Sequence, residues 1–246
     1  MATDRRQFLK NLAPNDPLPV GDQRYVDCSA VRGTDMLQAE LADTIRNSNG
    51  HASCQLISGH RGCGKTTELF RVQDALMKPK DESPKFFVVY IEADQYLSLN
   101  DVQAADVLLS VVTGIWEQVH ENTDLRLDKL PVLTDFFGAI ARLFGSTNLE
   151  LTLGIAKVKT DLKRNPTNRQ LLRDHIRERT SNLHEAVNEL VEAVRNGLSA
   201  KGYQGFVTIF DNLDRMVRRQ LDNQKGPTRT SSTSTIGIPS PPWIAI

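Results

Sequence analysis

The chain has 246 residues, of which 39% are hydrophobic, so it can bury the core of one large domain or of one domain with an insertion. Its 30 basic and 30 acidic residues cancel, so no global field favours nucleic acid or an anionic membrane, and no apolar run approaches the length of a membrane span. The 3 cysteines lack C-x-x-C spacing, which argues against a disulfide framework or a zinc site and fits a reducing cytoplasm.

The chain begins with a segment that we expect to be a flexible arm over residues 1–24, because residues 11–24 are rich in Pro, Asn and Asp. A helix is predicted over residues 35–47, where Leu37, Leu41 and Ile45 are spaced four apart. The Asn-Ser-Asn-Gly run that follows is typical of a helix end.

The strongest motif is a Gly-rich turn between a predicted buried strand at residues 54–58 and a predicted helix at residues 67–77. It matches the phosphate-binding pattern G-x-x-x-x-G-K-[ST], and its residues, with the one that follows, are Gly59, His60, Arg61, Gly62, Cys63, Gly64, Lys65, Thr66 and Thr67. Glycines let successive backbone N–H groups point inward at phosphate oxygens, and the helix adds the positive end of its dipole. The motif therefore predicts binding of a nucleoside triphosphate.

Two side chains of this loop have predicted roles of their own. Lys65 supplies a positive charge that reaches the β- and γ-phosphates, and we expect it to be catalytic. The hydroxyl of Thr66 is a predicted ligand of Mg²⁺.

A continuous apolar run at residues 86–91 predicts a parallel strand that is covered on both faces. Together with the loop and its flanking elements it forms one βαβ unit. Glu92 and Asp94 fall at the end of this strand, where they either order Mg²⁺ and water or are simply solvated.

Residues 95–203 are predicted to be a largely helical insertion. Asn100 is the expected cap of a helix over residues 101–121, and shorter and longer helices are expected at residues 133–143 and 166–199. Strict alternation of Leu149, Leu151, Leu153 and Ile155 predicts a half-buried strand, continued by a bulge or hairpin into residues 158–162. One edge of this predicted strand is basic, with Lys157, Lys159, Lys163 and Arg164. No aromatic residues are interleaved with them, so we expect a solvated edge rather than a nucleic-acid site.

A second chemical motif follows the insertion, where a buried strand at residues 206–210 delivers Asp211 at its carboxyl end. A carboxylate at this place holds Mg²⁺ opposite Thr66. Asp211 is therefore a predicted metal ligand and catalytic residue, and Asp214, three residues further on, is a second candidate carboxylate.

The run of apolar residues followed by Asp211-Asn212-Leu213-Asp214-Arg215 resembles the Walker B box of the additional-strand P-loop ATPases, in particular the AAA+, STAND and KAP groups. With the phosphate loop as Walker A, the resemblance covers residues 26–215, interrupted by the insertion. It implies an α/β fold, a three-layer arrangement of a parallel sheet with helices on both faces, and ATP and Mg²⁺ as cofactors.

The chain departs from that family in one residue of the site. Most AAA+ enzymes carry Glu directly after the metal-binding Asp, and here that position is Asn212. An amide orients water but does not accept its proton, so Asp214 is the candidate general base.

The resemblance also implies that the core, residues 25–225, is C-terminally incomplete. The family has two more parallel strands after Walker B, one of them between the phosphate-loop strand and the Walker B strand. Residues 226–246 contain Arg229 as their one charged residue and have no periodicity, so we expect an unstructured tail from a truncated or out-of-frame end, or a linker.

Three functions fit these residues. The first is a cytoplasmic ATPase that couples ATP binding and hydrolysis to a conformational change in a larger assembly, through an unidentified protein partner or self-assembly. The second is a nucleotide-binding switch with negligible hydrolysis, which Asn212 favours, and a truncated inactive fragment is the third. A nucleic-acid-loading ATPase shares the motifs, but no DNA-binding domain is recognisable.

Overall fold

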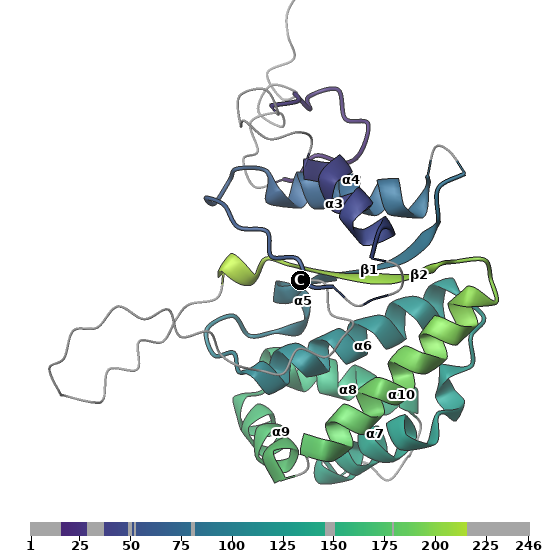
Figure 1. Ribbon diagram of the computed structural model, residues 1–246. Helices are drawn as coiled ribbons and strands as arrows, with labels where there is room; N and C mark the ends of the chain where they lie inside the picture. Colours follow the sequence, from purple (N-terminus) through teal and green to yellow (C-terminus); the bar gives the residue numbers. More distant parts are fainter. Residues whose placement is uncertain are drawn as a thin grey trace, which may run out of the picture.

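The structure, a computed structural model, describes residues 16–28, 37–48, 51, 53–79, 82–145, 151–178 and 180–215. Most of the predicted arm and the predicted tail at residues 226–246 lie outside these ranges. Two parallel strands occupy the centre, with two helices on one side and a larger group of helices on the other (Figure 1).

The sheet consists, in the described ranges, of β1 (Phe86–Glu92) and β2 (Gly205–Asp211), and both predicted strands are confirmed. Phe86 lies opposite Gly205 and Glu92 opposite Asp211, so the two strands end together at the same edge of the sheet. Alternate side chains point to opposite faces, as the pleat requires. Each face is buried in a separate apolar cluster.

The smaller layer contains α3 (Leu37–Arg46) and α4 (Lys65–Met77), which lie above the strands in Figure 1. Both helices were predicted, although α4 begins two residues earlier than expected, directly after the loop. Three side chains of α4 pack against the strands on this face, and they are Leu69, Val72 and Leu76.

The larger layer is helical. After β1 come α5 (Ala93–Tyr96), α6 (Ala104–Asn122), the 3₁₀ turn η1 (Leu127–Lys129), α7 (Pro131–Leu143), α8 (Leu151–Arg164), α9 (Pro166–Glu178) and α10 (Thr180–Ser199), and η2 (Leu213–Arg215) follows β2. Phe87, Val89 and Ile91 of β1 pack into this layer. The prediction that Asn100 caps this helix is wrong, because α6 starts later, with a capping box between Gln103 and Asp106.

The predicted strand and hairpin are wrong over residues 151–162, since α8 occupies them, and the predicted start of the strand at Leu149 lies outside the described residues. Ile155, Val158 and Leu162 are fully buried, and their spacing of three and four residues is the stripe of a helix. The predicted basic edge therefore lies on this helix, where Lys159 pairs with Glu117 at 2.6 Å. The single long helix expected over residues 166–199 is two helices, α9 and α10.

The predicted strand at residues 54–58 is also not formed, although these residues are described. Leu56 is 82% exposed, and residues 55–57 and β2 line a common cavity of about 110 Å³. A strand needs a ladder of hydrogen bonds with a neighbour. Here a cavity lies between the segment and β2, and the segment has no regular secondary structure.

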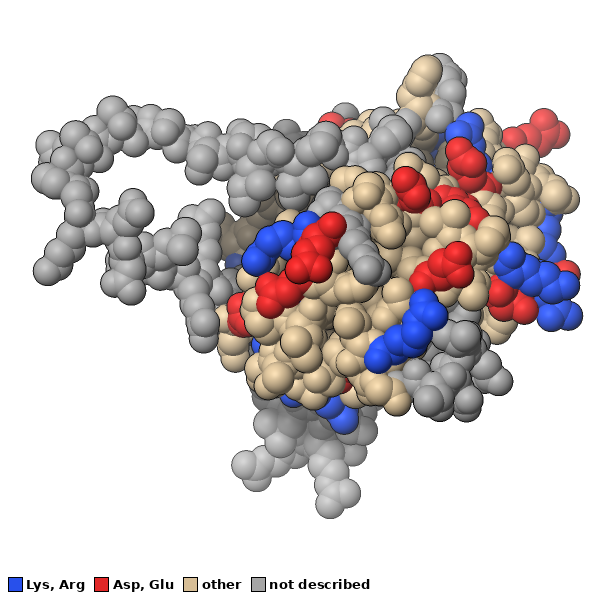
Figure 2. Space-filling view, turned by 90° about the horizontal axis from the view of Figure 1, so that it is seen from below, with Lys and Arg blue, Asp and Glu red and all other residues tan. Residues whose placement is uncertain are grey.

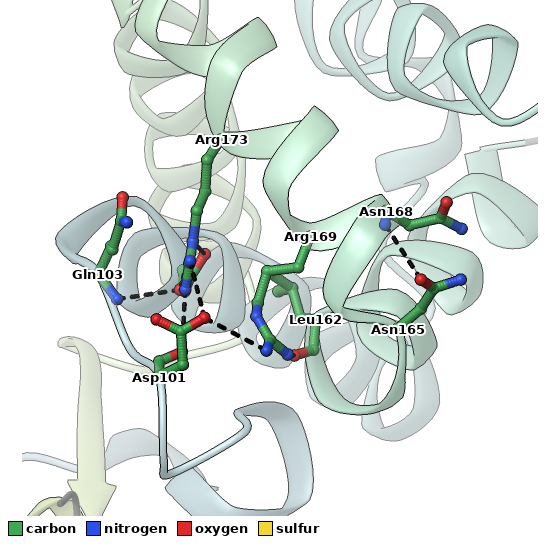
Figure 3. A network of polar contacts seen from close by, with 8 residues as sticks. Asp101, Gln103, Leu162, Asn165, Asn168, Arg169 and Arg173 are labelled. Carbon is green, nitrogen blue, oxygen red and sulfur yellow. Dashed lines mark hydrogen bonds and ion pairs between the residues drawn. The ribbon is translucent and has the colours of Figure 1, made fainter. Parts of the chain in front are cut away.

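A polar network inside the helical layer joins α9 to the start of α6 (Figure 3). Nε of Arg173 donates to both carboxylate oxygens of Asp106 at 3.1 Å, and its Nη1 donates to Asp101 at 3.0 Å. Arg169 donates to the carbonyl of Leu162 at 2.9 Å. The two arginines are buried, so this network fixes how α9 packs on α6.

The outer side of the helical layer carries interspersed charges. Figure 2 shows Lys and Arg beside Asp and Glu over the described part of this side, without a large patch of one sign. No helix in the described ranges is long and apolar enough to cross a membrane.

Candidate phosphate-binding site

The loop at residues 59–64 turns sharply into α4. Gly62 and Gly64 have φ angles of 82° and 91°, the left-handed region that favours glycine. At Gly59 a Cβ would lie 2.9 Å from Sγ of Cys63, so a side chain there would crowd the loop. Gly64 is the N-cap of α4, and the helix therefore begins at the loop with its N–H groups directed toward it.

Lys65 lies at the first position of α4 and folds back over the loop. Its Nζ donates to the carbonyl oxygens of Gly59 at 3.0 Å and His60 at 3.2 Å. The cationic group is therefore held beside the loop that the sequence motif defines.

A cavity of about 360 Å³ opens in front of the loop. It joins parts of the chain that are distant in sequence: the loop and the start of α4, the region after β1, and the region after β2. Its lining consists of Asp16, Pro17, Arg61, Gly62, Gly64, Lys65, Thr66, Thr67, Glu92, Asp94, Asp211, Asn212 and Arg215. Most of the predicted site residues thus come together.

Asp211 connects the two motifs. The hydroxyl of Thr66 donates to Oδ2 of Asp211 at 2.7 Å, and the backbone N–H of Asn212 donates to Oδ1 at 2.7 Å. Asn212 has a left-handed φ of 67°, an uncommon conformation that asparagine tolerates better than most residues. The carboxylate predicted to face Thr66 does so directly.

Tyr90 is a site residue that sequence reasoning missed. Its hydroxyl donates to Oδ2 of Asp211 at 2.8 Å. Its backbone is held in turn by Gln118 of α6, which accepts from its N–H at 2.9 Å and donates to its carbonyl at 2.6 Å. A tyrosine near the end of a buried strand needs a hydrogen-bond partner for its hydroxyl. The tyrosine in this apolar run was therefore the one feature of the sequence that could have pointed to this contact.

The protonation of Tyr90 suits this role. Burial, and then the negative charge of Asp211, raise the pKa of its hydroxyl well above its ordinary value. The hydroxyl of Tyr90 therefore keeps its proton at neutral pH and above, and it acts as the donor toward Asp211.

The residues fit a magnesium ion bound with a nucleotide. In the described part of the chain no group of three or more His, Cys, Asp or Glu residues could hold a metal alone. Mg²⁺ is usually bound through one or two protein oxygens, waters and substrate phosphates. Thr66 and Asp211 place a hydroxyl and a carboxylate oxygen in contact, which is a donor set of that kind.

The remaining predicted residues lie at or near the cavity. Thr67 lines the cavity, and its hydroxyl accepts the backbone N–H of Leu18 at 3.1 Å. Glu92 lines the cavity and accepts from Gln95 at 2.8 Å. Cys63 is exposed. Asp214 lies in η2, and the position of its side chain is outside the described part of the structure.

Comparison with known protein families, with curated proteins and with solved structures finds no match to this chain.

If the cavity binds ATP with Mg²⁺, as the sequence motifs predict, replacing Tyr90 by Phe is expected to lower ATP affinity about tenfold in the presence of Mg²⁺, since a hydrogen bond to a charged group contributes about 1.5 kcal/mol or more. The measurement is a calorimetric titration with and without EDTA. Tyr203→Phe, which alters a ring packed against Phe87 away from the cavity, is the control. An equal loss with and without EDTA would show that Tyr90 does not act through Asp211 and the metal.

Proposed function

We propose that this chain is a magnesium-dependent, ATP-binding P-loop ATPase of the AAA+, STAND and KAP type. The observation that carries the proposal is the hydrogen bond between Thr66 and Asp211, because it brings together the two motifs from which the function was predicted. The parallel pairing of β1 and β2, whose carboxyl ends meet beside the loop, supports it.

In this proposal the loop receives the phosphates. Backbone N–H groups of residues 59–66 and the amino end of α4 donate to phosphate oxygens, and Lys65 exchanges the carbonyls of Gly59 and His60 for β- and γ-phosphate oxygens. Thr66 and Asp211 hold Mg²⁺, which neutralises phosphate charge when bound. Tyr90 and the N–H of Asn212 orient the Asp211 carboxylate.

Hydrolysis requires a group that takes a proton from the attacking water. We assign this role to Asp214, because the amide of Asn212 does not accept a proton. The binding-switch function, with negligible hydrolysis, is favoured by the same side-chain amide. Asn212 follows Asp211 directly, and its backbone N–H donates to the Asp211 carboxylate. We infer that either function acts in the cytoplasm, where cysteines outside disulfides, such as Cys28 and Cys54, persist. It would act there on a protein partner or on a second copy of the chain.

The test compares Asp211→Ala with Asp214→Asn. Asp211→Ala is expected to weaken ATP binding about tenfold or more with Mg²⁺ and much less with EDTA, because it removes a metal ligand. Asp214→Asn is expected to lower turnover about tenfold or more with little loss of affinity, as removal of a general base does.

The measurements are ATP titration and phosphate release by the purified chain. Equal weakening by Asp211→Ala with and without Mg²⁺ would contradict the metal assignment. Saturable ATP binding without turnover in the unaltered chain would select the switch. Loss of turnover in Asn212→Ala, but not in Asp214→Asn, would reverse the two roles.

A further inference from the structure

An ion pair lies in the lining of the cavity, beside the ends of the two strands. Nη1 of Arg215, in η2, lies 3.3 Å from Oδ2 of Asp94, in α5. Both residues line the same cavity as Lys65 and Thr66. The pair thus links the segment after β2 to the segment after β1 at the wall of this cavity.

The charges around this cavity are nearly balanced. Its described lining holds three cationic side chains, Arg61, Lys65 and Arg215, and four carboxylates, Asp16, Glu92, Asp94 and Asp211. A triphosphate adds several negative charges, of which the metal and Lys65 neutralise a part. Arg215 is a further cation available to the outermost phosphate, and it is occupied by Asp94 in the structure.

The pair is of the kind that exchanges partners easily. Both side chains are 38% exposed, and an ion pair that is open to water contributes little to stability. Oδ1 of Asp94 is buried and has no hydrogen-bond partner among the described residues, so a wider network does not reinforce the contact. A guanidinium binds a phosphate through two parallel hydrogen bonds, which is a stronger arrangement than this single contact.

We propose that Arg215 binds the terminal phosphate of ATP and that Asp94 holds the guanidinium when that phosphate is absent. The inference rests on the proposed function, and it assigns to the same site the residue that distinguishes a triphosphate from a diphosphate. ATP displaces Asp94 from Arg215, whereas ADP, which ends one phosphate earlier, leaves the pair intact.

The experiment is calorimetric titration of the full chain with ATP and with ADP, both with Mg²⁺. Arg215→Ala is expected to lower ATP affinity about tenfold and to change ADP affinity less than twofold, because the variant loses a charge-assisted contact to the terminal phosphate alone. Asp94→Asn is expected to raise ATP affinity about threefold and to leave ADP affinity unchanged, since it removes a competitor for the guanidinium.

Arg177 provides a matched control, because it forms an Arg–Asp pair of the same 3.3 Å length on α9 and does not line the cavity. Arg177→Ala is expected to bind both nucleotides as the unaltered chain does. Arg215→Lys keeps the charge but loses the planar guanidinium, so its ATP affinity should lie between those of Arg215→Ala and the unaltered chain. If Arg215→Ala does not fold, Arg215→Lys is compared with the unaltered chain instead.

Equal losses for ATP and ADP, or no loss for either, in the Arg215 variants would overturn this inference while leaving the phosphate loop in place. Binding of neither nucleotide by the folded, unaltered chain would overturn the proposed function, and this inference with it.

Discussion

Replacing Lys65 by alanine is expected to abolish measurable ATP binding, a loss of about 100-fold or more, because charge-assisted hydrogen bonds to two phosphates disappear together. Lys65 is the cationic residue at the junction of the loop and α4, where its Nζ lies over the carbonyls of Gly59 and His60. The variant keeps the backbone N–H groups of the loop but loses the cation that we place between the β- and γ-phosphates. The measurement is ATP titration by calorimetry, accompanied by circular dichroism to show that the variant is folded.

Lys78→Ala is the matched control for this variant. Lys78 follows the same helix, is 79% exposed and pairs with Asp74 at 2.9 Å, outside the cavity. Its removal takes the same charge from the protein without touching the loop, so ATP affinity should stay within about twofold, since exposed charges act weakly at a distance. Similar affinities for the Lys65 and Lys78 variants would remove the basis for phosphate binding by this loop.

Replacing Asp106 by alanine is expected to destabilise the fold by about 3 kcal/mol or more, because it leaves the buried charge of Arg173 without its main partner. The side chains of Arg173 and Asp106 are 4% and 1% exposed, so water does not replace the lost contact. Asp106 also accepts the backbone N–H of Gln103 at 3.0 Å in the capping box of α6. Urea unfolding, followed by far-ultraviolet circular dichroism, measures the change.

The control for this variant is Asp174→Ala, which breaks the exposed pair with Arg177 and should change stability by about 0.5 kcal/mol or less. A double variant, Asp106→Leu with Arg173→Leu, should recover part of the loss, because it removes both buried charges at once. If Asp106→Ala and Asp174→Ala cost the same, the network does not fix the helical layer.

The elements around the site were predictable because their signals are local. The apolar run of β1 and that of β2 are bounded by polar turns, and they form the predicted parallel strands. The glycines of the loop require special φ angles, so the turn into α4 could be located to within two residues. The meeting of Thr66 with Asp211 followed from the motifs, although the two residues are far apart in the sequence.

Other features depend on contacts that the sequence does not display. Leu151 and Ile155 satisfy both the alternation of a strand and the four-residue spacing of a helix. Val158 and Leu162 are buried in the helical layer, and burial at these positions requires a helix. Residues 54–58 have the composition of a strand, but a strand also needs a paired neighbour. Tyr90 counted as one more apolar residue until its hydroxyl was seen to reach Asp211.

The most direct test of the central claim is a calorimetric titration of the purified chain with ATP and Mg²⁺, repeated with the Lys65→Ala variant. We expect saturable binding of one ATP per chain that weakens when EDTA removes the metal and disappears in the variant. A folded chain that binds no ATP, or that binds it equally well with and without Lys65, would show that this loop is not a nucleotide site.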